Sequence, residues 1–230
     1  MTRILYDLAL GDEDVRPSPY CWMVKFALLH KGLTFETRPV RFADKSKYPD
    51  PDYGKVPVLI DNGEMIKDSP VIAAWLDRKY PQNPLTSTKA EKAAAEFYGA
   101  WGSSALNAAL APMLMLRLAN AVADEDKAYF RMTREKRFGK TLEEVAATPG
   151  AAERAQAVLN VLAAPLSSHR YLGGGAPNLA DYVVFSSFMW QRTVTLKELY
   201  PAPEPVAAWR ERMLDLFDSY ARNAKSADAA

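Results

Sequence analysis

The sequence predicts a chain in two parts, an α/β unit over residues 1–82 and an all-helical unit over residues 89–230. In the first third, short runs suited to strands alternate with runs of helical periodicity. After Pro84 the chain is rich in Ala, Leu and Met and shows no strand-like alternation, which is typical of a helical domain. The segment from Pro81 to Thr88, with two prolines and several polar residues, is the predicted linker.

The predicted order of the first part is β-α-β, a loop, then β-β-α. Gly32 gives the first helix a glycine stop, and Pro81 ends the second. The tight-turn signal Asp61-Asn62-Gly63 predicts that the strands on either side of it are antiparallel. We expect strands over residues 3–8, 35–40, 56–60 and 64–67, helices over 19–30 and 69–77, and a loop over 41–53.

The second part contains four apolar runs with helical character. The charge-dense stretch from Asp124 to Lys140 is expected to form a solvated helix and loop. Acidic residues interleave there with basic ones, which weakens its interpretation as a nucleic-acid patch. The four helical runs cover residues 89–123, 151–166, 178–191 and 206–224.

Composition excludes several classes of function. A content of 49% hydrophobic and 25% charged residues is typical of a soluble globular protein, and a net charge of +1 argues against a nucleic-acid partner. Cys21 is the only cysteine and His30 and His169 are the only histidines, so an internal disulfide is excluded and we expect no metal site. We expect no membrane span, since no apolar run approaches about 20 residues. The apolar N-terminal stretch is too short for a signal peptide, so we expect a cytoplasmic protein.

Two helix starts flank a Val-Pro strand within the first eighty residues. Ser18-Pro19 and Asp68-Ser69-Pro70 both place a capping side chain just before a proline, and their ordinary interpretation is structural. A helix N-terminus also carries a partial positive charge and unpaired N–H groups. The first start could therefore stabilise a thiolate, and the second could hold a ligand carboxylate.

Two further positions lie near these helix starts. Cys21 follows Ser18 by three residues, and it is either a small residue packed under the sheet or a residual redox thiol. The absence of a second cysteine argues against a dithiol mechanism. Val56-Pro57 on its own indicates a strand edge, because proline cannot donate to the ladder.

Taken in order, these segments resemble the glutathione transferase superfamily. The stretches are S-P-Y-C-W-M-V-K-F-A-L, G-K-V-P-V-L and D-S-P-V-I-A-A-W-L-D-R-K-Y-P. The later run from Gly173 to Tyr182 resembles the start of the family's buried helix. Its Asn178 and Asp181 have the N-cap and N3 spacing of a capping box, with Asp in place of the usual Glu or Gln. The resemblance implies a thioredoxin-like N-terminal domain followed by an all-α C-terminal domain.

Three stretches resemble the etherase branch of that superfamily, which includes bacterial β-aryl etherases of lignin degradation and fungal etherase-like transferases. The first is S-P-Y-C-W-M-V-K-F-A-L-L-H-K-G. The two that lie outside the general superfamily pattern are R-E-K-R-F-G-K-T-L-E-E-V and Y-L-G-G-G-A-P-N-L-A-D-Y-V-V-F-S-S-F-M-W-Q-R. This resemblance implies glutathione as cosubstrate, whose thiolate attacks an aromatic electrophile and releases a phenol. A displacement of this kind needs no metal.

The resemblance also implies residue roles. Ser18 matches the residue that hydrogen-bonds the glutathione sulfur. Val56 matches the residue whose backbone pairs with the cysteinyl part, with Pro57 cis. The γ-glutamyl end is expected at Asp68 and Ser69, and the glycyl carboxylate near Lys55. In the loop over 41–53, the further candidates for glutathione contacts, or else solvated charges, are Arg41, Lys45 and Lys47.

An aromatic electrophile needs a flat apolar pocket, which is expected between the two domains. The candidate lining residues, each of which could instead belong to ordinary helical core, are Tyr20, Trp101, Met113, Met115, Phe188 and Trp190. Three functions stay open: β-aryl ether cleavage, conjugation of other electrophiles or reduction of glutathionyl adducts through Cys21, and non-enzymatic binding of aromatics as a ligandin. The resemblance implies a homodimer.

Overall fold

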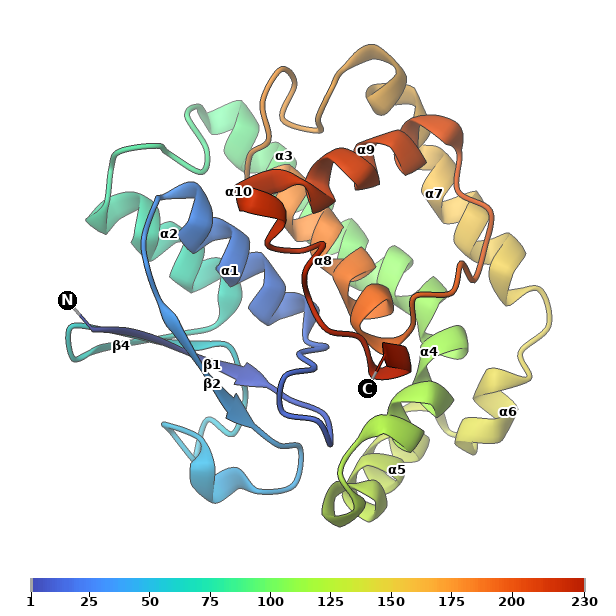
Figure 1. Ribbon diagram of the computed structural model, residues 1–230. Helices are drawn as coiled ribbons and strands as arrows, with labels where there is room; N and C mark the ends of the chain where they lie inside the picture. The colour runs from blue at the N-terminus through green and yellow to red at the C-terminus, as the bar shows by residue number, and fades with distance from the viewer. Residues whose placement is uncertain (1, 230) are drawn as a thin grey trace.

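The computed structural model describes residues 2–229 and contains a four-stranded mixed sheet in the order β2-β1-β3-β4 (Figure 1). β1 is parallel to β2 and antiparallel to β3, and β3 is antiparallel to β4 across the turn at residues 62–63. In the register, Leu5 of β1 lies opposite Leu59 of β3, and both are fully buried. The strands are β1 (Arg3–Leu8), β2 (Glu36–Val40), β3 (Val58–Asp61) and β4 (Glu64–Lys67).

The first two helices begin where the sequence predicts. α1 (Pro19–His30) has the predicted bounds, and α2 (Ser69–Lys79) runs two residues beyond the predicted end. β3 starts at Val58 rather than Val56, after a cis Val56–Pro57 peptide. Pro57 has no N–H with which to join the ladder. The loop over 41–53 holds one short 3₁₀ turn, η1 (Lys45–Lys47).

The helical half follows, and among the described residues its elements are helical throughout. The predicted run over 89–123 is divided by a π-helical turn, η2 (Gly102–Leu106), and the charged stretch forms one continuous helix, α5. The elements are α3 (Lys89–Trp101), α4 (Asn107–Ala121), α5 (Asp124–Phe138), α6 (Leu142–Ala146), α7 (Ala151–Ser168), α8 (Leu179–Val194), α9 (Glu204–Leu214), α10 (Leu216–Ser219) and η3 (Ala227–Ala229).

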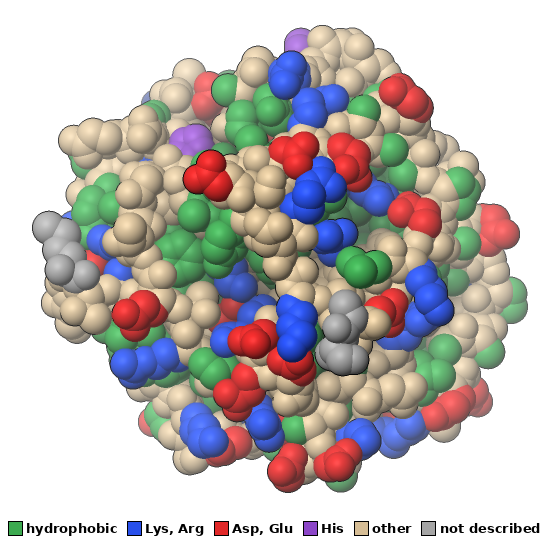
Figure 2. All heavy atoms as spheres, viewed as in Figure 1, with side chains coloured by type: hydrophobic (Ala, Val, Ile, Leu, Met, Phe, Trp, Pro, Cys, Tyr) green, Lys and Arg blue, Asp and Glu red, His purple; other side chains and the backbone are tan. Residues whose placement is uncertain are grey.

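This arrangement confirms the predicted fold class of a small mixed sheet with helices followed by a helical domain. The division at residues 82 and 89 stays a prediction. Basic and acidic side chains interleave over the face of the molecule seen in Figure 2, as the net charge of +1 suggests.

The prediction of one helix over residues 206–224 is wrong. α9 ends at Leu214, and Phe217, Asp218 and Ser219 have φ values of 53°, 55° and 61°. Left-handed backbone costs free energy for residues other than glycine, so tertiary contacts must hold it. The turn brings the Tyr220 ring to 5.9 Å from the Trp22 ring of α1, a contact that local sequence does not reveal.

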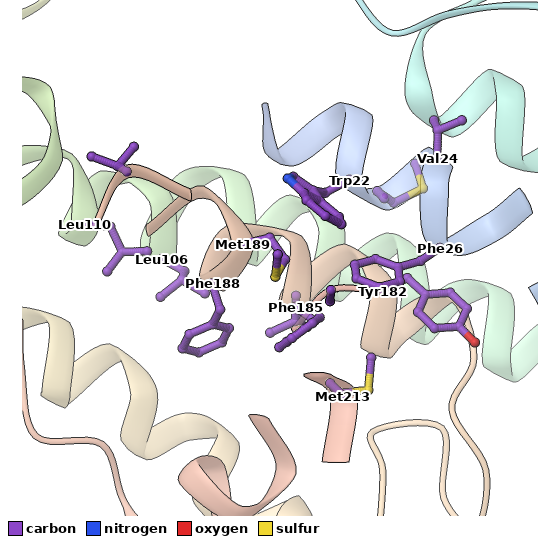
Figure 3. Close-up of a cluster of buried hydrophobic side chains, with 14 of the residues drawn as sticks. Trp22, Val24, Phe26, Leu106, Leu110, Tyr182, Phe185, Phe188, Met189 and Met213 are labelled. Carbon is purple, nitrogen blue, oxygen red and sulfur yellow. The ribbon is translucent and has the colours of Figure 1, made fainter. Parts of the chain in front are cut away.

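The two halves meet where α1 packs against α8. Figure 3 shows Phe26 of α1 beside Tyr182 and Phe185 of α8. Their ring centroids lie 5.7 Å and 5.5 Å from that of Phe26, and all three rings are buried. At the end of α1, His30 Nδ1 lies 2.7 Å from the Tyr182 hydroxyl oxygen. These contacts fix the direction of α1 relative to the helical half.

A fully buried carboxylate holds the start of α8. Asp181 accepts hydrogen bonds from the backbone N–H groups of Leu172, Gly173 and Asn178 and from Nε1 of Trp209, at 2.8–3.1 Å. With the Asn178 side chain accepting from Ala180 N at 2.8 Å, this is the predicted capping box. Burial raises the pKa of Asp181, while the donated bonds oppose that rise.

Replacing Asp181 by Ala leaves four buried donors without their acceptor. We expect the free energy of unfolding to fall by about 3 kcal/mol or more, since each unsatisfied buried group costs about 1–3 kcal/mol. Urea denaturation measures this difference. The matched control is Asp52→Ala, an exposed carboxylate, which should change stability by less than about 0.5 kcal/mol. Equal midpoints for the two variants would contradict a structural role for Asp181.

Candidate functional site

The N-terminus of α1 opens onto a cavity of about 400 Å³, and Ser18 lies at its edge. Ser18 is the N-cap of α1, and its Oγ accepts a hydrogen bond from Cys21 N at 3.3 Å. The side chain is only 6% exposed, yet it lines the cavity. Because a hydroxyl carries one donor besides its acceptor sites, Ser18 can still donate to an anion in the cavity.

The cis Val56–Pro57 segment lies at the same cavity, since Lys55 and Val56 line it together with Ser18. The Pro57 carbonyl oxygen accepts from Asp68 N at 3.4 Å, which ties this segment to the start of α2. Asp68 has a φ of 73° and caps α2 by accepting from Ser69 N at 2.9 Å. The fold therefore brings the start of α2 close to the cis peptide.

A second cavity of about 620 Å³ adjoins the first. It is lined by Ser69 of α2 and by small residues of α3 and α8, and Pro19 and Tyr20 border both cavities. Ser18 and Val56 thus line the first cavity and Ser69 lines the second, whereas Asp68 lines neither.

Half of the predicted apolar lining residues reach the first cavity. Tyr20, Met115 and Trp190 line it. Trp101, Met113 and Phe188 do not, which corrects that prediction. Phe188 is buried, and its ring centroid lies 5.7 Å from that of Trp209, because its face of α8 is turned toward α9. Trp101 and Met113 are partly buried against the hydrophobic core.

The aromatic wall that the sequence analysis missed comes from the loop after β2 and from α5. A usable signal was present in the segment interpreted as solvated, since Phe130, Arg134 and Phe138 recur at four-residue spacing on one helix face. The acidic and basic residues between these positions concealed this spacing. The missed lining residues are Phe42, Tyr48, Tyr129, Phe130, Arg134, Arg137 and Phe138.

The loop is held against α5 by Asp126, which is 2% exposed and accepts from Phe42 N at 3.3 Å and from Ala43 N at 2.8 Å. Of the loop cations, only Lys45 lines the cavity. Arg41 instead pairs with Glu13 and Glu125, at 3.5 Å each.

The third loop cation, Lys47, pairs with Asp44 at 3.6 Å and does not line the cavity. The structure therefore leaves Lys45 as the cation of this loop at the cavity.

Cys21 lines neither cavity and is fully buried. Burial raises the pKa of the thiol well above its usual range, and the nearby Asp7 carboxylate raises it further. Asp7 forms a buried ion pair with Lys25. A reactive cysteine needs an accessible, electropositive surrounding, so the geometry favours a packing role.

We expect the Cys21 thiol of the native protein to react with Ellman's reagent at least about 100-fold more slowly than the thiol of the unfolded chain. Unfolding in guanidinium should release one reactive thiol per chain, the single cysteine of the sequence. Rapid reaction of the native protein would instead support a redox role for Cys21.

Among residues 2–229, no group of three or more His, Cys, Asp or Glu side chains is arranged to hold a metal ion. The helices within this range lack the combined length and apolar character that crossing a membrane requires.

Two family models match the chain. The glutathione S-transferase N-terminal domain matches residues 14–84, and the glutathione S-transferase C-terminal domain matches residues 93–218.

Named relatives match over shorter stretches. The chain is 35% identical over 89 residues to glutathione S-transferase 1 of Dianthus caryophyllus, which covers 36% of this chain and 40% of that protein. It is 28% identical over 108 residues to a zeta-class glutathione S-transferase of Euphorbia esula, covering 44% and 46% respectively. The matches span less than half the length of these curated relatives.

Solved structures match over nearly the whole length. A glutathione S-transferase of Ceriporiopsis subvermispora in complex with glutathione has a TM-score of 0.78 and 25% identity, covering 96% of this chain and 98% of that one. The glutathione transferase GSTFuA3 of Phanerochaete chrysosporium has a TM-score of 0.75 and 22% identity, covering 100% and 97%, a likeness that shows the fold. With a family model matched in each part and the same fold in these structures, the chain belongs to the glutathione S-transferase family.

Proposed function

We propose that this protein activates glutathione as a thiolate at Ser18 and uses it to cleave β-aryl ethers with release of a phenol. The observation that carries the proposal is a capping hydroxyl at the N-terminus of α1 that opens onto an aromatic-walled cavity. Family membership and the glutathione complex of the Ceriporiopsis subvermispora relative support glutathione as the cosubstrate.

In this proposal glutathione lies along the two neighbouring cavities. The Val56 backbone pairs with the cysteinyl part, and Asp68 with the α2 start at Ser69 holds the γ-glutamyl end. The start of α2 at Ser69 is buried, and the partial positive charge of a helix N-terminus favours a carboxylate. Lys55, at the edge of the first cavity, receives the glycyl carboxylate.

The thiolate is stabilised by the Ser18 hydroxyl and by the N-terminus of α1. A free thiol has a pKa near ~8.5, and lowering it by ~2 units requires about 2.7 kcal/mol of preferential stabilisation. One charge-assisted hydrogen bond, worth about 1.5–3 kcal/mol, together with the helix dipole supplies an effect of this size.

The thiolate then displaces the aryloxy group. A C–S bond forms at the carbon beside the ketone while its C–O bond breaks, and the departing aryloxide takes a proton to become the phenol. The cavity orients the aromatic substrate between Met115, Trp190 and the Phe42–Phe130 pair. The etherase-like segments 134–145 and 171–192, the first of which supplies part of this wall, support this substrate class.

The experiment that tests the function incubates the protein with reduced glutathione and a β-aryl ether ketone and follows phenol release and thioether formation together. We expect both products in equal amounts. Phenol without the matching thioether would contradict displacement by glutathione. Conjugation of a simple aryl halide without ether cleavage would assign the protein to a general transferase function instead.

Replacing Ser18 by Ala should lower kcat/KM by about 10–100-fold, because the lost hydrogen bond is worth about 1.5–3 kcal/mol. The pKa of bound glutathione should rise, so the loss should be largest at low pH and shrink as pH increases. The control is Ser167→Ala on the exposed surface of α7. Unchanged kinetics and pH profile would make Ser18 a helix cap only, with the α1 N–H groups holding the thiolate.

One alternative function has an observation in its favour. The second cavity is the larger of the two and suits binding of aromatics without turnover, as a ligandin would require. Saturable binding of an aromatic dye with no conjugation of any electrophile would favour it. The buried position of the Cys21 thiol argues against reduction of glutathionyl adducts through this residue.

We further propose that the protein is a cytoplasmic homodimer. The reaction consumes reduced glutathione, which the cytosol maintains. Large exposed apolar side chains on β4, α2 and α3, at Met65, Val71 and Phe97, are available for a second copy. Sedimentation equilibrium should give twice the mass of one chain, and a monomer mass would contradict the dimer.

A further inference from the structure

The charged side chains that line the first cavity are all basic. Among the described residues its lining includes Lys45, Lys55, Arg134 and Arg137 and no Asp or Glu. None of these four takes part in an ion pair found among residues 2–229. An aromatic cavity with this charge is suited to a ligand that carries a negative group.

Arg134 is placed inside this cavity by the aromatic wall. Its guanidinium carbon lies 4.6 Å from the ring centroid of Phe130 and 5.1 Å from that of Phe42. Those two rings meet edge to face, with centroids 5.0 Å apart. Contact with both rings limits the positions open to the guanidinium, which favours its pairing with an anion in the cavity.

Most of the Arg134 donors are not used within the described chain. A guanidinium has five N–H donors, and the hydrogen bonds among residues 2–229 use one of them, from Nη1 to Thr133 Oγ1 at 2.8 Å. The fork of the guanidinium matches a carboxylate, which can accept two parallel bonds.

Lys45 adds a second positive charge to the lining of the cavity. Its Nζ lies 4.2 Å from the Tyr48 ring centroid and 5.8 Å from that of Tyr129. Burial lowers the pKa of Lys45 and the charge of Arg134 lowers it further, while the Asp126 carboxylate opposes this shift. Two like charges held near one another in an aromatic cavity repel, and a bound anion would remove that repulsion.

The position of Arg134 assigns this anion to the electrophile rather than to glutathione. Arg134 projects from α5 in the helical half, among Phe130 and Phe138. The glutathione residues proposed above, Val56 and Lys55, come from the sheet-containing half. A ligand group that pairs with Arg134 therefore meets the part of the cavity wall that the helical half supplies.

We propose that the second substrate is an aromatic carboxylate, that Arg134 pairs with its carboxylate and that Lys45 supplements the charge. This inference rests on the proposed function and names its substrate class. In the reaction the glutathione thiolate forms the C–S bond and the aryloxide leaves with the C–O electrons, while the ring carboxylate stays paired with Arg134. Arg134 is thus a specificity-determining residue.

The binding experiment uses two unreactive probes that differ only in charge, 4-phenoxybenzoate and 4-phenoxybenzamide. Each is titrated calorimetrically into the protein saturated with S-methylglutathione. We expect the wild-type protein to bind the acid about 10–100-fold more tightly than the amide, as a hydrogen-bonded charge pair implies. Equal affinities would overturn the proposal without any variant.

Variants of Arg134 test whether this residue causes the preference for the acid over the amide. Arg134→Met should reduce the acid-to-amide ratio to near one, and Arg134→Lys should keep part of it. The matched control is Lys136→Met, which removes an exposed charge from the same helix and should leave the ratio unchanged. Circular dichroism and thermal unfolding verify that each variant is folded, and the glutathione KM is measured separately. A raised glutathione KM in Arg134→Met with the acid preference intact would assign the charge to the glycyl carboxylate and overturn the proposal.

Turnover assays distinguish a failure of this inference from a failure of the proposed function. With β-aryloxy ketones whose leaving ring carries a 4-carboxylate or a 4-carboxamide, the acid should show a KM about 10–100-fold lower in the wild type but not in Arg134→Met. If neither ether releases phenol while the probe acid still binds preferentially, β-ether cleavage fails and the anion preference stands. If both ethers react with equal KM and the probes bind equally, the anion preference fails and the function stands.

Discussion

The packing of α1 against α8 is the contact on which the rest of the site depends. Phe26 lies between Tyr182 and Phe185, and the Asp181 carboxylate holds the start of α8 through four donated hydrogen bonds. Burial of large aromatic side chains contributes about 1.5–3 kcal/mol each, and their geometry restricts how the two helices cross. Because Ser18 caps α1, this packing also sets where its hydroxyl lies relative to the helical half.

A second contact completes the cavity from the other side. Asp126 at the start of α5 accepts two backbone hydrogen bonds from the loop after β2, so Phe42 lies against Phe130. One wall is thus built from segments more than eighty residues apart in the chain. A buried carboxylate that satisfies backbone donors is costly to remove, so the loop and the helix form one unit.

The two ends of the cavity have different chemistry. At the α1 end, a hydroxyl and a helix N-terminus favour an anionic sulfur. At the α5 end, Arg134 and Lys45 give a positive aromatic wall. Glutathione and an anionic aromatic would each meet a favourable potential at its own end. Cys21, in the first turn of α1, is fully buried and lines neither cavity.

The sequence was sufficient to predict those structural features whose physical cause lies within a few neighbouring residues. Pro19 and Gly32 predict the bounds of α1, and the spacing of Asn178 and Asp181 predicts the capping box of α8, because caps and stops act within a few residues. The helix starts at Ser18 and Asp68 were identified as candidate sites for the same reason.

The sequence could not predict contacts between segments that are far apart in the chain. The left-handed turn at Phe217 depends on the Tyr220–Trp22 contact, and no glycine or proline marks it. Phe188 faces the core, and Arg134 faces the cavity. Both orientations depend on which faces of α8 and α5 are covered by neighbouring segments.

The sequence by itself determined the strands and helices of the N-terminal part, the caps of α1, α2 and α8, and the family that the order of these segments indicates. Only the tertiary structure decided which side chains share a cavity and that the charges lining it are basic, since packing selects one face of each helix and periodicity alone cannot say which neighbour covers it.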